Sequence, residues 1–350
     1  MTADSHRDSC MPLSIDPQAL RQRLAAYQRP SHGRSVVEIV ITALPLFALW
    51  IGALWMVRQG WWWGVALTVP ASFFLVRLFM IQHDCGHASF FRSPTANAWT
   101  GRLIGVLTMT PYGYWRRTHA IHHATSGNLD RRELGAVETL TVEEYRAKGW
   151  LGRLAYRLYR NPVVMFGLGP GYMFVLQHRL PIGLMKEPPA WRSVIANSLG
   201  LALIILPQLL LGGVKGVLLV HLPIVLAAAS IGVWLFYIQH QFEGAYWARN
   251  GAWKPQEAAL LGSSHLDLPP VLRWFTANIG VHHVRHVGSK IPFYRLPQVL
   301  KEHPELKAVS RVTLWDAFKA IRLALWDEAQ GRLVSFREER LTRGAMPAAA

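Results

Sequence analysis

Cysteine is scarce in this sequence, with only Cys10 and Cys85 among 350 residues. Two thiols cannot form a disulfide framework, which favours a reducing compartment, and they cannot supply the ligands of an iron–sulfur cluster. The chain also lacks a flavin or nicotinamide fingerprint and a CxxCH haem-attachment motif. These absences exclude a protein stabilised by several disulfides. They also give no sequence sign of a bound flavin, nicotinamide, covalently attached haem or iron–sulfur cluster.

Acidic residues are also few, with 21 Asp and Glu against 37 Lys and Arg, which gives a net charge of +16. Such an excess suits an anionic lipid surface or an acidic protein partner. The basic residues are spread along the segments beside apolar runs and are not gathered in one recognition element. We therefore expect membrane lipids as partners and no nucleic acid.

Hydrophobic residues, by contrast, make up 51% of the chain. About 20 consecutive and mainly apolar residues are needed to cross the hydrocarbon core as a helix. Four runs have or approach this length, at residues 36–57, 62–81, 194–212 and 214–238. Since only a few residues separate the members of each pair, each pair predicts a tight helical hairpin. An apolar core hairpin of a soluble protein is the alternative interpretation.

Two hairpins return the chain to the side that it left, so all segments outside them share one side. Most Lys and Arg residues lie in these segments, while the opposite turns offer little beyond Arg58 and Lys215. The positive-inside rule makes the shared side cytoplasmic. We predict an all-α polytopic membrane protein with four spans and a cytoplasmic helical cap. Its expected parts are a cytoplasmic segment without a cleavable signal peptide (1–35), a membrane domain (36–337) and a C-terminal tail (338–350).

Histidine carries the strongest signal. Eight of the fifteen histidines fall in three boxes, HDCGH at 83–87, HAIHH at 119–123 and HHVRH at 282–286. A ninth, His240, directly follows the last apolar run. Spacings of three and four residues place imidazoles on one face of a helix, and imidazole is the commonest metal ligand. Imidazoles with almost no thiol indicate iron, copper, nickel or zinc, and nine candidates are enough for two ions.

The first box directly follows an apolar run that ends at Ile81. We therefore expect His83 and His87 on a helical extension that leaves the membrane. Asp84, between them, is a candidate for orienting a ligand imidazole by a hydrogen bond.

Two further patterns predict local structure. Apolar residues at spacings of three and four predict an amphipathic helix over residues 313–327, with Thr313 as its cap and Asp316 three residues later. His221 lies inside the fourth apolar run, where a titratable residue is a functional candidate by default. A buried hydrogen bond to a neighbouring helix explains it equally well.

Together these features resemble the membrane fatty acid desaturase family, from about residue 36 to residue 337. That family has two helical hairpins and three cytoplasmic boxes with the patterns HxxxH, HxxHH and HxxHH, and the three boxes of this chain stand in that order. The sequence around them looks like bacterial acyl-lipid desaturases of the Δ12 or omega-6-like branch, at residues 115–128, 239–243, 274–280 and 289–294. The resemblance implies a bacterial inner membrane, with the boxes and both termini on the cytoplasmic side.

The resemblance also implies a dinuclear non-haem iron site. Its ligands are carried over as His83, His87, His119, His122, His123, His240, His282 and His286. No catalytic residue beyond these ligands and no further cofactor-binding residue is implied.

One position departs from the family pattern, because Arg285 stands where the third box has its middle histidine. Arginine offers hydrogen-bond donors but no lone pair, so it cannot ligate iron. One ion therefore loses a ligand unless His283 or a water replaces it.

The function that the resemblance implies is oxygen-dependent desaturation of a lipid acyl chain. Dioxygen is the co-substrate, and the electrons come from an external donor, either a ferredoxin or a cytochrome b5-like carrier. Three alternatives remain open. They are a lipid or carotenoid hydroxylase or ketolase of the same superfamily, a homologue that Arg285 weakens catalytically, and a non-catalytic membrane protein that binds metal or senses lipid.

Overall fold

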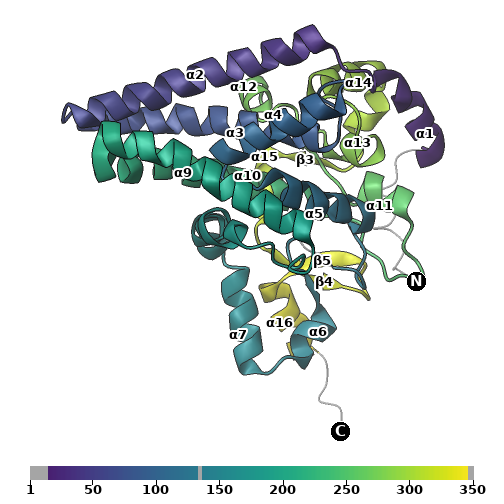
Figure 1. Cartoon of the computed structure of the whole chain (residues 1–350). Coiled ribbons are helices and arrows are strands. Elements are labelled where there is room, and N and C mark those ends of the chain that lie inside the picture. The colour runs from purple at the N-terminus through teal and green to yellow at the C-terminus, as the bar shows by residue number, and fades with distance from the viewer. Residues whose placement is uncertain (1–14, 133–135, 346–350) are drawn as a thin grey trace.

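A computed structural model describes residues 15–132 and 136–345 of the chain. In these ranges the protein is mostly helical (Figure 1). The α-helices of six residues or more are α1 (Pro17–Leu24), α2 (His32–Arg58), α3 (Thr68–Gly86), α4 (Pro94–Leu107), α5 (Tyr112–Thr125), α6 (Val142–Ala147), α7 (Trp150–Tyr159), α9 (Pro188–Gly216), α10 (Leu222–His240), α11 (Pro255–Leu261), α12 (Pro270–Phe275), α13 (His282–Val287), α14 (Leu296–Glu302), α15 (Leu314–Ala320) and α16 (Phe336–Ala345).

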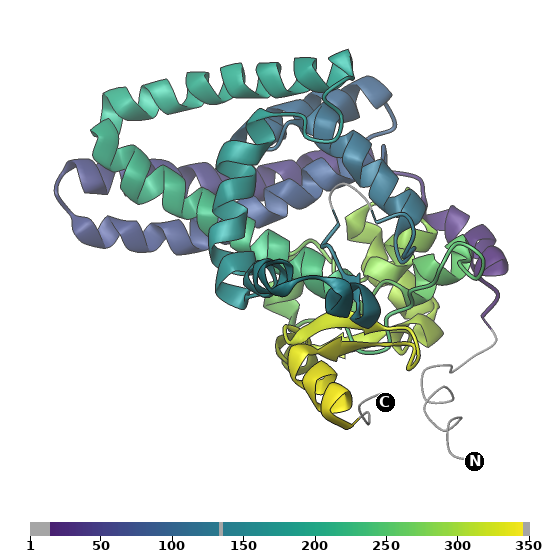
Figure 2. The ribbon, with the colours of Figure 1, turned by 90° about the horizontal axis from the view of Figure 1, so that it is seen from below.

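Helices α2 and α3 form the first predicted hairpin and lie side by side in both views (Figures 1 and 2). A turn with Gly60 at a φ of 81° and a 3-10 segment, Trp62–Leu67, join them. Among the described residues, three continuous helical stretches are long and apolar enough to cross a membrane. The first two, His32–Arg58 and Trp62–Gly86, are the arms of this hairpin.

The third stretch, Pro188–His240, contains α9, a π-helical segment and α10. It is not one straight helix. Gln208 Nε2 lies 3.0 Å from His221 Nδ1, although 13 residues of straight helix would separate them by about 20 Å. The chain reverses at Gly213, whose φ of 62° is a left-handed conformation that glycine adopts without steric cost. The reversal expected between residues 212 and 214 is therefore present, and Figure 2 shows the two arms of the hairpin.

The prediction of an all-α fold is wrong in one respect, because two small sheets are present. One has the order β1 (Leu140–Thr141), β4 (Leu323–Asp327), β5 (Arg332–Ser335), and the other pairs β2 (His265–Asp267) with β3 (Arg311–Thr313). The β4 and β5 strands pair antiparallel, and β1 joins β4 in parallel.

The helix predicted over residues 313–327 is correspondingly too long. Its start is confirmed, because Thr313 caps α15 and forms a capping box with Asp316. The helix ends at Ala320, after which β4 begins at Leu323. The reason is tertiary: the buried Leu325 and Trp326 pair with both neighbouring strands, and this pairing overrides the helical spacing.

The short helices and both sheets lie toward one end of the long helices (Figures 1 and 2). Helices α3 and α10 end there, at Gly86 and His240, and they pack against each other. Helices α5 and α13 lie at the same end and complete the wall of the histidine site described below. Ile81, Ile238 and Val284 are fully buried in the core that these helices share.

Candidate metal centre

Four helices bring the predicted metal ligands together. His83 lies in the last turn of α3 and His87 caps that helix, so the expected helical extension is confirmed. Helix α5 carries the whole second box, α10 ends on His240, and α13 carries the third box. Because α5 and α13 present imidazoles three and four residues apart, each helix directs several rings to one face.

The eight predicted ligands form two groups of four imidazoles, and in each group the candidate ligand atoms all lie within 4.8 Å of one another. We call them the first cluster (His83, His87, His119 and His123) and the second cluster (His122, His240, His282 and His286). The rings of His123 and His286 join the two clusters, stacked with centroids 4.0 Å apart. The two clusters are therefore adjacent, as a dinuclear centre requires.

The spacing of the nitrogens fits metal ions at both clusters. In the first cluster His119 Nε2 lies 3.1 Å from His87 Nε2 and 3.2 Å from His123 Nε2. An ion about 2.0–2.1 Å from each imidazole nitrogen would set neighbouring nitrogens about 3.0 Å apart at right angles and about 3.4 Å apart at tetrahedral angles. The distances in the first cluster agree with such a geometry.

The second cluster has the same spacing through all four of its rings. His240 Nε2 lies 3.0 Å from His122 Nε2 and 3.2 Å from His282 Nε2, and His282 Nε2 lies 3.0 Å from His286 Nε2. Within the described part of the chain, no carboxylate joins either cluster. Imidazole donors without carboxylates suit iron, copper, nickel and zinc, whereas magnesium and calcium prefer oxygen.

The protonation state of the rings also suits metal binding. Burial holds the pKa of His119 and of His286 well below the usual value for histidine, and the neighbouring imidazoles lower it further. The rings are therefore neutral at pH 7, and each has one nitrogen with a free lone pair.

Neighbouring groups fix two of the rings. His240 Nδ1 lies 3.0 Å from the carbonyl oxygen of Gly262, which directs its Nε2 into the second cluster. Trp115 stacks on His119, with centroids 4.7 Å apart and ring planes 13° apart. Sequence analysis missed both contacts. The spacing of Trp115, four residues before His119 on a helix, was a signal for the second contact, whereas no local signal pointed to Gly262.

The remaining residues of the third box lie outside the clusters. His283 turns away, with its Nε2 3.0 Å from the carbonyl oxygen of Leu306, so it does not replace the missing ligand. Arg285 is fully buried, and its Nη2 lies 2.7 Å from Asp84 Oδ1 and 2.9 Å from His83 Nδ1. Asp84 also accepts a hydrogen bond from the Phe293 backbone N–H at 2.7 Å. Asp84 thus contacts Arg285 and is 3.9 Å from His83 Nδ1, too far for the expected hydrogen bond.

A pocket of about 550 Å³ adjoins the second cluster. His122 and His240 of that cluster line it together with Phe236, and Asp130 and Glu138 are among its charged lining residues. The pocket therefore borders one side of the proposed metal centre.

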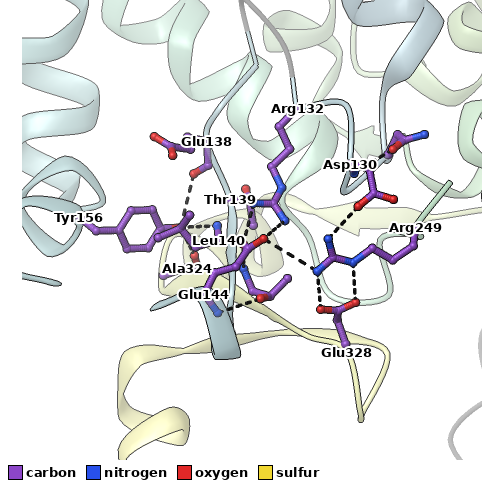
Figure 3. Close-up of polar contacts among 12 residues, drawn as sticks. Asp130, Arg132, Glu138, Thr139, Leu140, Glu144, Tyr156, Arg249, Ala324 and Glu328 are labelled. Atoms are coloured by element: carbon purple, nitrogen blue, oxygen red, sulfur yellow. Dashed lines mark hydrogen bonds and ion pairs between the residues drawn. The ribbon is translucent and has the colours of Figure 1, made fainter. Parts of the chain in front are cut away.

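Two charged residues that line this pocket, Asp130 and Arg132, form ion pairs with neighbouring side chains (Figure 3). Arg249 lies between Asp130 and Glu328, with nitrogen to oxygen distances of 2.8 Å to each. Arg132 binds both carboxylate oxygens of Glu144, at 2.6 and 2.9 Å. These contacts tie the loop after α5 to the loop after α10 and to the β4–β5 turn.

Comparisons with known proteins agree with the histidine pattern. The family model described as fatty acid desaturase matches residues 60–317. The chain is 42% identical over 318 residues to a fatty acid desaturase of Bacillus subtilis. The aligned region covers 91% of this chain and 90% of that protein.

More distant relatives are named with substrates and a donor. An sn-1 acyl-lipid omega-3 desaturase (ferredoxin) of Synechocystis is 27% identical, over 69% of this chain and 68% of its own length. An sn-1 oleoyl-lipid 12-desaturase of Synechocystis is 26% identical, with 72% of each chain covered. With the family model matching most of its length and the eight histidines gathered at one centre, the chain belongs to the fatty acid desaturase family and is an oxidoreductase of that family.

Proposed function

We propose that this protein is an oxygen-dependent desaturase that introduces a double bond into a lipid acyl chain at a dinuclear iron centre. The observation that supports it most is the pair of adjacent four-imidazole clusters in a chain of the desaturase family. The eight proposed iron ligands are the residues of the two clusters. In the net reaction, a –CH2–CH2– unit, dioxygen, two electrons and two protons give a –CH=CH– unit and two molecules of water.

The residues of the site have distinct tasks in this reaction. When bound, the iron ions would activate dioxygen and oxidise an unactivated C–H bond, which no side chain can do. The imidazoles would hold the ions through neutral nitrogens. Because neutral ligands add no negative charge, they would not offset the positive charge of the ions. The apolar core under the site, including Ile81 and Ile238, excludes water from the reacting carbons.

We further propose that the two hairpins cross a bacterial inner membrane four times, with the histidine boxes and the cap in the cytoplasm. The tips of the hairpins carry little charge beyond Arg58 and Lys215, whereas most of the basic residues belong to the opposite end. By the positive-inside rule that opposite end is cytoplasmic.

The pocket beside the second cluster is the proposed access for the substrate. Phe236 and Trp247 provide apolar lining near the imidazoles, and Asp130 and Arg132 provide polar lining. An acyl chain has no polar group near its middle, so the depth of its apolar path must select the carbons that react. An acyl-lipid substrate also agrees with the names of the distant relatives.

The electrons must come from another protein, and we propose a ferredoxin or a cytochrome b5-like donor. The chain has a net charge of +16, which would attract an acidic donor. The names of two relatives include ferredoxin, which agrees with this proposal.

The proposal is tested by expressing the chain in a desaturase-deficient bacterial host and determining the positions of double bonds in its lipids by mass spectrometry. We expect new unsaturated acyl chains with the natural protein and none with His122→Ala, which removes a ligand of the second cluster. A hydroxylated product would instead identify a hydroxylase. An unchanged lipid profile, with the protein folded and iron-loaded, would refute desaturation.

A further inference from the structure

Arg285 lies where a metal-bound His83 would need a hydrogen-bond acceptor. Its Nη2 is 2.9 Å from His83 Nδ1 and 2.7 Å from Asp84 Oδ1, and all three side chains are buried. An arginine side chain only donates hydrogen bonds, so His83 Nδ1 must accept here. An accepting Nδ1 carries no proton, and in a neutral ring the proton is then on Nε2.

This protonation pattern is opposed to metal binding. A metal-ligating histidine almost always donates its other ring N–H to a carboxylate, a carbonyl oxygen or water. If Nε2 of His83 bound an ion, Nδ1 would carry the proton and would face the donor of Arg285. If Nδ1 bound the ion, the hydrogen bond from Arg285 would be lost. Either mode of binding breaks the present contact, and the nearest carboxylate, Asp84, is already in an ion pair with Arg285 and accepts a hydrogen bond from the Phe293 backbone N–H.

The contacts inside the two clusters also set His83 apart from the other seven imidazoles. In the second cluster, Nε2 atoms at 3.0–3.2 Å connect all four rings. In the first cluster, such contacts connect only His87, His119 and His123. Among the described residues, no hydrogen bond joins His83 to another imidazole, although its ring centroid is 4.6 Å from that of His119. His83 is therefore at the first cluster but is bonded to Arg285.

We propose that Arg285 is a positioning residue that withholds His83 from the metal, so that the first cluster binds its ion through His87, His119 and His123 and more weakly than the second cluster binds its own. This inference rests on the proposed metal centre and changes it at one of the eight proposed ligands, His83, so that the two sites are unequal. Arg285 thus has two effects. It leaves its own position in the third box without a ligand, and it also hinders metal binding by His83.

The test is a ferrous iron titration of the detergent-purified protein without oxygen, with a competing chelator and with bound iron measured by mass spectrometry. The natural protein should bind iron in two steps, and His286→Ala assigns the tighter step to the second cluster. In the weaker step, His87→Ala should lower the affinity at least about tenfold, whereas His83→Ala should change it less than about threefold. This comparison requires no change at Arg285, so it holds even where a variant of that buried residue fails to fold.

Arg285→Gln provides the complementary measurement. The glutamine amide can accept from His83 as well as donate to Asp84, so it permits either tautomer of the ring. It should raise the first-cluster affinity at least about tenfold and make His83→Ala as harmful as His87→Ala, with the second step unchanged. Arg285→Lys, which keeps a group that only donates, is the matched control and should leave the first cluster weak.

The proposal is overturned if His83→Ala weakens iron binding in the natural protein as much as His87→Ala does, or if the two clusters bind with equal affinity. These outcomes are independent of turnover. A protein that binds iron as described but forms no unsaturated lipid would refute the proposed desaturation and leave this inference standing. A protein that forms unsaturated lipid and binds its two ions with equal affinity would support the proposed desaturation and refute this inference.

Discussion

Arg77 of α3 and Glu38 of α2 form a buried ion pair between the two helices of the first hairpin. Arg77 Nε also donates to Thr42 Oγ1 at 3.2 Å, and its Nη1 donates to the carbonyl oxygen of Trp274, next to the end of α12. The guanidinium therefore satisfies groups of the hairpin and of the cap at once. A charge in such an apolar setting is tolerated only with partners of this kind.

Replacing Glu38 with Gln should destabilise the protein strongly, because Arg77 would remain buried without a counter-charge. We expect a loss of about 3–5 kcal/mol in the free energy of unfolding, measured by denaturation in detergent. Arg34→Gln is the matched control. It removes a partner 2.7 Å from the same carboxylate, but one whose side chain is 57% exposed, so the loss should stay below about 1 kcal/mol. Equal losses from the two variants would contradict this account.

The ion pair also shows what the sequence can and cannot predict. The hairpins and the three histidine boxes were predictable, because apolar length and spacings of three and four residues are local properties. The set of eight ligands, with His240 included and His283 left out, came from the resemblance to the desaturase family. In the sequence, Glu38 and Arg77 are isolated charges within apolar runs, and nothing local links them. Their pairing across 39 residues depends on how α2 and α3 pack, which no local pattern encodes.

The same limit explains the errors and omissions. The chemistry of arginine shows from the sequence alone that Arg285 offers no metal ligand. Its contact with His83, 202 residues away, required the fold. The helix predicted over residues 313–327 had a correct cap at Thr313, and strand pairing decided where it ended. Local signals thus predicted where elements begin, while long-range contacts determined how they end and what their side chains meet.

The reversal in the second hairpin should depend on Gly213. Its φ of 62° is strained for residues with a side chain, so Gly213→Ala should cost about 1–2 kcal/mol in the free energy of unfolding. Gly212→Ala is the control, because a Cβ there would meet only Leu54 at an ordinary distance of 3.4 Å. The variants are compared by thermal unfolding in detergent, and a Gly212 variant less stable than the Gly213 variant would count against a requirement for glycine at the turn.

Acid should destabilise the protein in part through His178, outside the membrane-spanning stretches. Burial lowers the pKa of His178 to about 4, while its ring lies 3.3 Å from the carbonyl oxygen of Met109. Because the unfolded chain, with a pKa of about 6.5, takes up this proton first, the contribution to stability is complete above pH 6.5 and is lost as the pH falls toward 4.

The size of this effect follows from the difference between the folded and unfolded pKa of His178. The loss in the free energy of unfolding is on the order of 3 kcal/mol between pH 7 and pH 4. His178→Gln retains a donor for the Met109 carbonyl but does not titrate. Its unfolding free energy should therefore fall less steeply with acid than that of the natural protein, by about that amount. Parallel curves for the two proteins, measured by denaturant titration at several pH values, would assign the acid sensitivity to other groups.

Metal content should distinguish two neighbouring histidines of the third box. His286 belongs to the second cluster, with its Nε2 3.0 Å from His282 Nε2, whereas His283 faces the Leu306 carbonyl on the other side of α13. His286→Ala should lower the iron affinity of the second cluster at least about tenfold and abolish lipid desaturation. His283→Gln, which still donates to the carbonyl, should retain both ions and differ only in thermal stability. Iron analysis after dialysis against a weak chelator measures both variants. Loss of an ion from the His283 variant alone would mean that the third box is rotated about α13 relative to this structure, and would assign the metal to the opposite face of that helix.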